Sequence, residues 1–367
     1  MPQLIPYHLT FSGGLHIGIR GVDLEESSVV IPSDTLFSAI AATWRRMGQD
    51  VDQLLTPFAG KSPTPPFLLT SAFPRVGNVR FHPMPVKPQT LFSDALLQTR
   101  GKALKRIQFL SEGLLQKLLA GKKLDEDLFA EETKAHTEKN GFALQGGTLW
   151  LSAAEYAQLP PAFQREKGKE LSIRYEPVWA SERTPRVTIG RITSAANIFH
   201  AGRVKFAQDC GLWFGLAWTR VDPNLETLVG QALALLQHAG LGGERTSGYG
   251  AFTFAEAARV TLPDPTRGHA ALLLSRYHPR GEELPTALTH AEAAYQLVPV
   301  GGWLNFPGYA PQRRKRLLMV SEGSLVCPPD YPAGDCSDVR PEYPAGKFAH
   351  AIYRAGFALA VGWKTGG

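Results

Sequence analysis

The chain has 367 residues, 44% of them hydrophobic and 20% charged, which excludes a disordered protein and leaves room for two domains. Three cysteines are too few for a disulfide framework and indicate a reducing compartment, while the net charge of +6 favours polyanionic partners. Neither a signal peptide nor a run of about 18 apolar residues is found, so we expect a cytoplasmic protein without a membrane contact.

The N-terminal elements follow a strand–turn–helix pattern. Tyr7 to Phe11 alternate between apolar and polar residues, which predicts a strand followed by a turn at Gly13-Gly14. Ser33 is predicted to be the N-cap of the next helix, and Asp34 to complement its dipole. The apolar stripe of this helix comprises Leu36, Phe37, Ile40, Ala41 and Trp44.

The middle of the chain is rich in charge. Apolar residues recur at helical spacing from Ala103 to Leu119, which predicts one helix there, inside a basic segment from Arg100 to Lys123. An acidic stretch from Asp125 to Glu132 follows, and such a split in sign is typical of a solvated surface. Whether the basic segment touches a partner, RNA or only water stays open. We expect an exposed loop from Gln158 to Lys169.

Residues 186–206 read RVTIGRITSAANIFHAGRVKF and precede a buried strand that contains Leu212 to Trp218. The pattern predicts a long hairpin that projects from a sheet. Cations interleaved with an aromatic residue suit unstacked nucleotides, although an ordinary solvated hairpin reads the same way.

A glycine-rich loop occupies residues 240–250, with the sequence GLGGERTSGYG. Asp222 and Pro223 predict the start of a preceding helix, Gly240 can close it, and Tyr249 to Phe254 predict a strand. The order is therefore helix, loop, strand, whereas phosphate loops of nucleotide enzymes run from strand to helix. The loop is not a mononucleotide cradle.

The chemistry of this loop still suits an anion. Glycines permit positive φ, and successive exposed N–H groups form a concavity for an anionic oxygen. Arg245 adds a charge, and Thr246 and Ser247 add hydroxyl donors, a combination that fits a ribose-phosphate chain. A tight connection that merely packs a helix onto a sheet is the alternative.

The C-terminal part is predicted as a second α+β unit, from 270 to 367, after a linker from 259 to 269. Strands are expected at 270–277 and 317–320, a helix at 287–295, and a final strand pair at 349–361, broken at Gly356. Cys327 and Cys336 lack CxxC spacing, so we expect no zinc site.

Several of these segments resemble one family when taken in order. Ser33 to Ile40 follow a strand that ends in Leu-His-Ile-Gly18, and Pro83 to Pro88 precede a lysine-rich segment. The hairpin, the glycine loop and Ile352 to Gly356 come next. Together they resemble the RAMP family, and within it the Csm subunit that caps the 5′ end of the guide RNA in type III-A CRISPR effectors.

The resemblance implies an α+β fold of two ferredoxin-like (RRM-like) modules, at 1–258 and 270–367, with the hairpin as a thumb. It implies a non-catalytic subunit of the RNA-guided effector complex, and we expect neither a cofactor nor a metal. Its partners would be the 5′ tag of the crRNA, a large polymerase-like subunit and a repeating RAMP backbone subunit. The RNA-binding residues that it implies are Gly242, Gly243, Arg245, Thr246, Ser247, Gly248, Arg186, Arg191, Phe199, Lys205 and, more weakly, His16.

Three alternatives stay open. RAMP relatives include endoribonucleases that mature crRNA, and these need a general base and acid. The histidines, His16 among them, are scattered without recurring spacing. Asp34 lies in the first turn of a predicted helix, where an acidic side chain stabilises the helix dipole. The equivalent subunit of type III-B complexes and a pure protein–protein adaptor are the other two.

Overall fold

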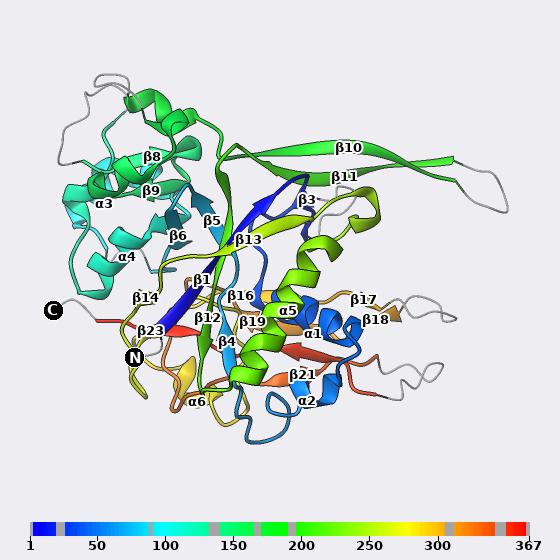
Figure 1. Ribbon diagram of the computed structural model, residues 1–367. Helices are drawn as coiled ribbons and strands as arrows, with labels where there is room; N and C mark the ends of the chain where they lie inside the picture. Colours follow the sequence, from blue (N-terminus) through cyan, green and yellow to red (C-terminus); the bar gives the residue numbers. More distant parts are fainter. Residues whose placement is uncertain are drawn as a thin grey trace.

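The computed structural model describes residues 3–19, 26–87, 91–131, 140–164, 170–189, 196–304, 312–341 and 350–364. Its largest feature is a ten-stranded sheet with the order β13-β1-β12-β5-β6-β7-β9-β8, in which β14 also pairs with β1 and β4 with β12. A long hairpin leaves the body on one side, and the C-terminal part occupies the lower half of the view in Figure 1. The fold is mixed α+β, as predicted.

The main elements of the N-terminal part follow the order β-α-β-β-β-α-β, which has one strand more than the ferredoxin-like order β-α-β-β-α-β. These elements are β1 (Gln3–Phe11), α1 (Ser33–Arg46), β4 (Phe67–Leu69), β5 (Phe73–Val76), β12 (Cys210–Trp218), α5 (Pro223–Ala239) and β13 (Phe252–Glu256). Minor elements between them are β2 (Gly18–Ile19), β3 (Glu26–Ser27) and α2 (Val51–Leu55). The strands lie side by side as β13, β1, β12 and then β4 and β5, which pair with different parts of β12.

Strand β12 is the buried strand that the sequence predicts. Its residues alternate between two cores: Trp213 belongs to one apolar cluster, while Phe214 packs with Leu9 of β1 and Leu233 of α5 in the other. Because both faces of β12 are covered, nearly every residue in it is buried, and its sequence reads as a continuous apolar run.

An insertion between β5 and β12 extends the sheet. It contains β6 (Val79–Pro83), α3 (Asp94–Leu104), β7 (Phe109–Ser111), α4 (Glu112–Leu119), β8 (Phe142–Leu144) and β9 (Leu149–Leu151). The single helix predicted from Ala103 to Leu119 is therefore wrong. Residues 109–111 pair with β6 and β9 instead, because the sheet satisfies their backbone groups and buries all three side chains.

The hairpin is formed by β10 (Trp179–Ile189) and β11 (Ala196–Phe206), and it begins seven residues earlier than expected. The ladder is antiparallel and unbroken from the pair Trp179 and Phe206 to the pair Ile189 and Ala196. Figure 1 shows both strands extending away from the body, which confirms the projecting hairpin.

The C-terminal part consists of short strands. They are β14 (Val260–Thr261), β15 (Ala271–Leu273), β16 (Leu297–Val300), β17 (Trp303–Leu304), β18 (Gln312–Arg313), β19 (Leu317–Val320), β20 (Leu325–Val326), β21 (Cys336–Asp338), β22 (Tyr353–Ala355) and β23 (Ala360–Gly362). Strand 317–320 is confirmed, and the strands expected around Gly356 are β22 and β23, which pair with β21 and β15 rather than with each other.

The helix predicted at 287–295 is wrong. Helix α6 (Leu284–Ala287) ends where that helix was to begin, and residues 290–293 form a turn before Ala294 bridges to Leu325. Because α6 is the one helix in the described residues after 270 and has four residues, the second ferredoxin-like module and the domain boundaries stay predictions.

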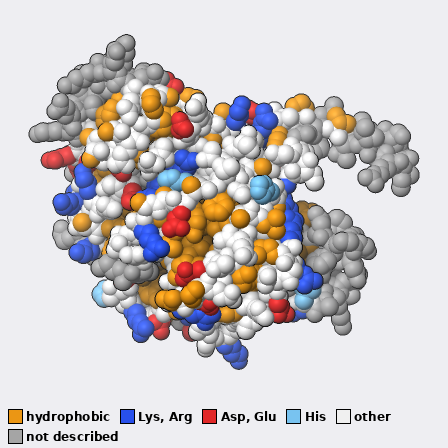
Figure 2. Space-filling model, in the orientation of Figure 1, with side chains coloured by type: hydrophobic (Ala, Val, Ile, Leu, Met, Phe, Trp, Pro, Cys, Tyr) orange, Lys and Arg blue, Asp and Glu red, His pale blue; other side chains and the backbone are white. Residues whose placement is uncertain are grey.

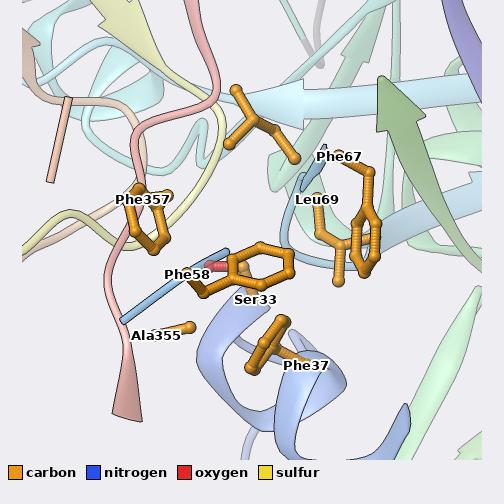
Figure 3. A pocket seen from close by; sticks show the side chains of 8 residues that line it. Ser33, Phe37, Phe58, Phe67, Leu69, Ala355 and Phe357 are labelled. Atoms are coloured by element: carbon orange, nitrogen blue, oxygen red, sulfur yellow. The ribbon is translucent and has the colours of Figure 1, made fainter. Parts of the chain in front are cut away.

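The N-terminal and C-terminal parts share a core. One apolar cluster contains Leu4 of β1, Leu262, and Leu272 of β15. Figure 3 shows a second contact near the start of α1, where Phe58 packs edge to face on Phe357 with ring centres 5.8 Å apart. The cavity among these side chains encloses about 20 Å³, room for about one water molecule, so it is no ligand site.

Polar contacts reinforce this junction. Helix α1 begins at Ser33 itself, after Pro32, so the prediction that Ser33 is the N-cap is wrong. Instead its Oγ accepts a hydrogen bond from the backbone N–H of Arg276 at 3.0 Å, and the Arg276 guanidinium pairs with Glu322 at 3.1 Å. The hydroxyl of Ser33 thus joins the two parts of the chain.

The three cysteines Cys210, Cys327 and Cys336 are free and buried, in line with the expected lack of disulfides. None of the described helices combines the length and apolar character that crossing a membrane requires.

Helix α5 contains one glycine, Gly230, whose replacement with alanine is expected to stabilise the protein. A Cβ at this position would meet nothing within 4 Å, and alanine favours a helix over glycine by about 0.5–1 kcal/mol. Urea denaturation should show that rise in the free energy of unfolding. A decrease would mean that α5 is less regular around Gly230 than described.

Candidate nucleic-acid interface

The glycine loop is built as its sequence predicts. The carboxylate of Asp222 accepts a hydrogen bond from the N–H of Leu225 at 3.1 Å and starts α5, and Gly240 ends it with φ of 77°. A short 3-10 turn, Arg245–Ser247, follows between Glu244 and Gly248, both left-handed. The chain then enters β13.

Close backbone approach explains two of the glycines. A Cβ on Gly242 would lie 2.2 Å from the carbonyl oxygen of His16, and one on Gly250 would lie 1.9 Å from that of Leu241. The N–H of Gly243 donates to His16 O at 2.8 Å, and the N–H of Gly250 donates to Gly14 O at 2.8 Å. The loop is thereby fixed to residues 13–17.

Because of these bonds, the loop has fewer free N–H groups for an anion than the sequence predicts. The N–H groups of Gly243, Ser247 and Gly248 donate to carbonyls of the protein and are not available to an anion. Within the described chain, those of Gly242, Glu244, Arg245 and Thr246 make no such bond.

The side chains at the tip of the loop are open to a ligand. Arg245, Thr246 and Ser247 are exposed, and none of them makes a side-chain hydrogen bond or ion pair with any described residue. A guanidinium and two hydroxyls therefore face solvent beside free amides, a donor set that suits phosphate and ribose oxygens.

His16 connects the loop to the hairpin. Its side chain is buried, and Nδ1 lies 2.6 Å from the carbonyl oxygen of Gly202 in β11. Because a carbonyl can only accept, Nδ1 carries the hydrogen and donates. Its own carbonyl accepts from Gly243, so His16 holds the loop against the hairpin base.

A second contact between loop and hairpin involves residues that sequence reasoning did not select. Arg203 of β11 pairs with Glu182 of β10 at 2.6 Å, and its guanidinium lies 5.9 Å from the ring centre of Tyr249 in the loop. The hydrogen bond that the Arg203 guanidinium donates to the Glu182 carboxylate raises the pKa of Arg203. The Tyr249 hydroxyl is 3.4 Å from Thr184 Oγ1. Only the spatial pairing of β10 with β11 reveals this set.

The predicted hairpin residues are placed unequally. Lys205 is exposed and makes no ion pair with the described residues. Arg186 and Phe199 are cross-strand partners in the ladder, but their side chains, like all of Arg191, lie outside the described residues. Figure 2 shows Lys and Arg side chains on the part of the hairpin near the body.

Two histidines, His8 and His82, are unsuited to acid–base chemistry. Burial lowers the pKa of His8 to about 4 and that of His82 to about 3, with nearby arginines adding to the effect. Both are therefore neutral at pH 7, and His82 is fully buried.

Asp34 is enclosed in the junction of the two parts. Its carboxylate pairs with Arg354 of β22, and both side chains are buried. Arg354 Nη2 also donates to Gly301 O at 3.1 Å. An RNA strand on the surface cannot reach this carboxylate. Besides its expected effect on the helix dipole, Asp34 forms an ion pair that joins the two parts of the chain.

Comparisons with known proteins now add to this geometry. The family model described as "CRISPR Csm4 C-terminal domain" matches residues 266–363. Two curated relatives named "CRISPR system Cms protein Csm4", from the Mycobacterium tuberculosis strains CDC 1551 / Oshkosh and ATCC 25618 / H37Rv, are each 28% identical over 317 residues. That alignment covers 86% of this chain and 85% of theirs.

Solved structures support the fold. A chain in the crystal structure of a Csm3-Csm4 subcomplex of the type III-A CRISPR-Cas interference complex gives a TM-score of 0.65 at 16% identity, with 99% of both chains covered. A chain of a Csm1-Csm4 cassette in complex with pppApA gives 0.55 at 16% identity, covering 99% of this chain and 98% of that one. The family model of the C-terminal part, the curated relatives and the shared fold all make the chain similar to Csm4 proteins of CRISPR systems.

Proposed function

We propose that this chain is a non-catalytic crRNA-binding subunit of a type III-A CRISPR effector complex. It binds the repeat-derived 5′ tag of the crRNA and bridges the large polymerase-like subunit to the repeating backbone subunit. The similarity to Csm4 proteins supports this role, and so do the structural relatives, which were solved as Csm3-Csm4 and Csm1-Csm4 assemblies. We place the protein in the cytoplasm, where crRNA is found.

The observation that carries the RNA-binding role is the exposed tip of the glycine loop. Arg245, Thr246 and Ser247 present unpaired donors, and the loop is fixed to the hairpin base through His16. A rigid donor set can fix the register of a single strand through its backbone, and the exposed Lys205 continues the basic path along the hairpin.

The same geometry supports a role without catalysis. The ring of His16 is buried and bonded to Gly202 O, so it is poorly placed to act as a general base on a 2′-hydroxyl. Asp34 is buried in an ion pair. Neither His16 nor Asp34 is therefore accessible to an RNA strand on the surface.

Replacing Arg245 with alanine is expected to weaken binding of a tag RNA by about 1–3 kcal/mol. The loss follows from one charge-assisted phosphate contact, so the slope of log affinity against log salt should fall by about 1. Filter binding or fluorescence anisotropy at several salt concentrations measures both. Arg267→Ala is the matched control, because Arg267 is an exposed arginine outside the glycine loop and the hairpin, and its partner is Asp330.

Three outcomes would contradict the proposal. Unchanged affinity of Arg245→Ala would remove the loop from the RNA site. A binding signal without salt dependence would favour the adaptor. Cleavage of a repeat-containing RNA that His16→Ala abolishes would establish the endoribonuclease instead.

A further inference from the structure

Three potential metal ligands meet at the surface of the C-terminal part. They are His290 and Glu292, which belong to one turn, and Cys327, which directly follows β20. The imidazole nitrogen, the carboxylate oxygen and the sulfur all lie within 4.8 Å of one another. His290 Nδ1 and Glu292 Oε2 are 4.0 Å apart. Ligands of one tetrahedral zinc ion lie roughly 3–4 Å apart, so small side-chain shifts suffice.

The backbone holds the two ligand segments together. Ala294 and Leu325 form a β-bridge, with N–H to O distances of 3.0 and 2.8 Å in the two directions. The N–H of Cys327 donates to Ala287 O at 3.0 Å, and the turn is closed by Ala293 N–H to His290 O at 2.9 Å. The approach of the three side chains therefore follows from main-chain pairing.

Burial differs across the cluster in a way that suits an ion entering from solvent. The side chain of Cys327 is fully buried, whereas those of His290 and Glu292 are 40% and 31% exposed. A thiol at the floor and two ligands at the rim leave one side of a tetrahedron open to water.

The donor types narrow the choice of cation. Thiolate and imidazole select zinc and related transition metals, while calcium and magnesium require oxygen ligands. Three protein ligands with one open position match zinc sites that keep a water.

We propose that His290, Glu292 and Cys327 bind a thiophilic divalent cation, zinc in the first place. The bound ion would tie the 290–293 turn to the end of β20. This site is separate from the glycine loop and does not depend on the RNA-binding proposal. It departs from the expectation of no metal, which was drawn from the spacing of cysteines and histidines along the sequence.

Cobalt(II) titration of the purified full-length chain tests the site, because a thiolate bound to cobalt gives a charge-transfer band in the near ultraviolet. We expect one cobalt per chain and displacement of the band by zinc. His290→Ala should weaken zinc binding at least about tenfold. Loss of a residue that only hydrogen-bonds to a metal ligand already lowers metal affinity about tenfold or more. His290 is exposed, so this variant keeps the core intact.

Cys327→Ser should abolish the band, while Cys336→Ser and His269→Ala should leave it unchanged. Cys336 is a second buried cysteine, and His269 is a second exposed histidine. No cobalt band in the native chain, or a band that persists in both Cys327→Ser and His290→Ala, would overturn the proposal.

Discussion

Asp34→Ala is expected to lower the free energy of unfolding by about 3–5 kcal/mol, because removing one partner of a buried ion pair leaves the other charge uncompensated. Arg354, the partner, stays buried beside Arg314, whose pKa is lowered by burial and by the charge of Arg354. The pair joins α1 to β22, so the loss should loosen the junction between the two parts of the chain. Urea denaturation measures it.

The control is the exposed pair of Arg267 and Asp330, where Asp330→Ala should cost at most about 1 kcal/mol. The double variant of Asp34→Ala with Arg354→Met should be more stable than Asp34→Ala, since it removes the uncompensated charge. A cost below about 1 kcal/mol for Asp34→Ala would show that water reaches the carboxylate.

Gly242→Ala is expected to destabilise the protein by about 2–3 kcal/mol. A left-handed alanine costs about 1–2 kcal/mol, and displacing the His16 carbonyl breaks its hydrogen bond with Gly243, worth about 1 kcal/mol. Because the loop would leave residues 13–17, affinity for the tag RNA should fall at least as far as in Arg245→Ala. Denaturation and RNA binding are measured on the same preparation.

Gly248→Ala separates the cost of a left-handed alanine from the cost of displacing the His16 carbonyl. Gly248 also has a positive φ, 82°, but a Cβ there would meet nothing within 4 Å. We expect only the cost of the left-handed alanine, about 1–2 kcal/mol, with the contact to His16 kept. Equal effects of the two substitutions would show that the close approach to His16 does not hold the loop.

Local signals in the sequence were reliable where one segment decides its own structure. The loop is an example: Asp222 caps α5, Gly240 ends it, and the order of helix, loop and strand excludes a nucleotide cradle. The buried strand β12 and strand 317–320 were predicted in the same way. The same reasoning failed at Ala103 to Leu119, because apolar spacing cannot tell a helix from a short strand added to a sheet.

The residues of the candidate sites were partly within reach of the sequence. Arg245, Thr246 and Ser247 were selected from their chemistry, and they are exposed and unpaired within the described chain. Glu182 and Tyr249, which contact Arg203 between the loop and the hairpin, were not selected. Neither belongs to a motif, and only the folded hairpin brings them beside Arg203.

The sequence by itself determined the α+β class, the hairpin, the anatomy of the glycine loop and the family resemblance, since these depend on residues close together in the chain. Only the tertiary structure decided which segments meet. Asp34 and Arg354 are 320 positions apart, and His16 and Gly202 are 186 apart. The β-bridge between Ala294 and Leu325 brings Cys327 close to His290 and Glu292. Local propensity carries no information about such pairs, because their contact energy appears only when the sheet aligns the strands that bear them.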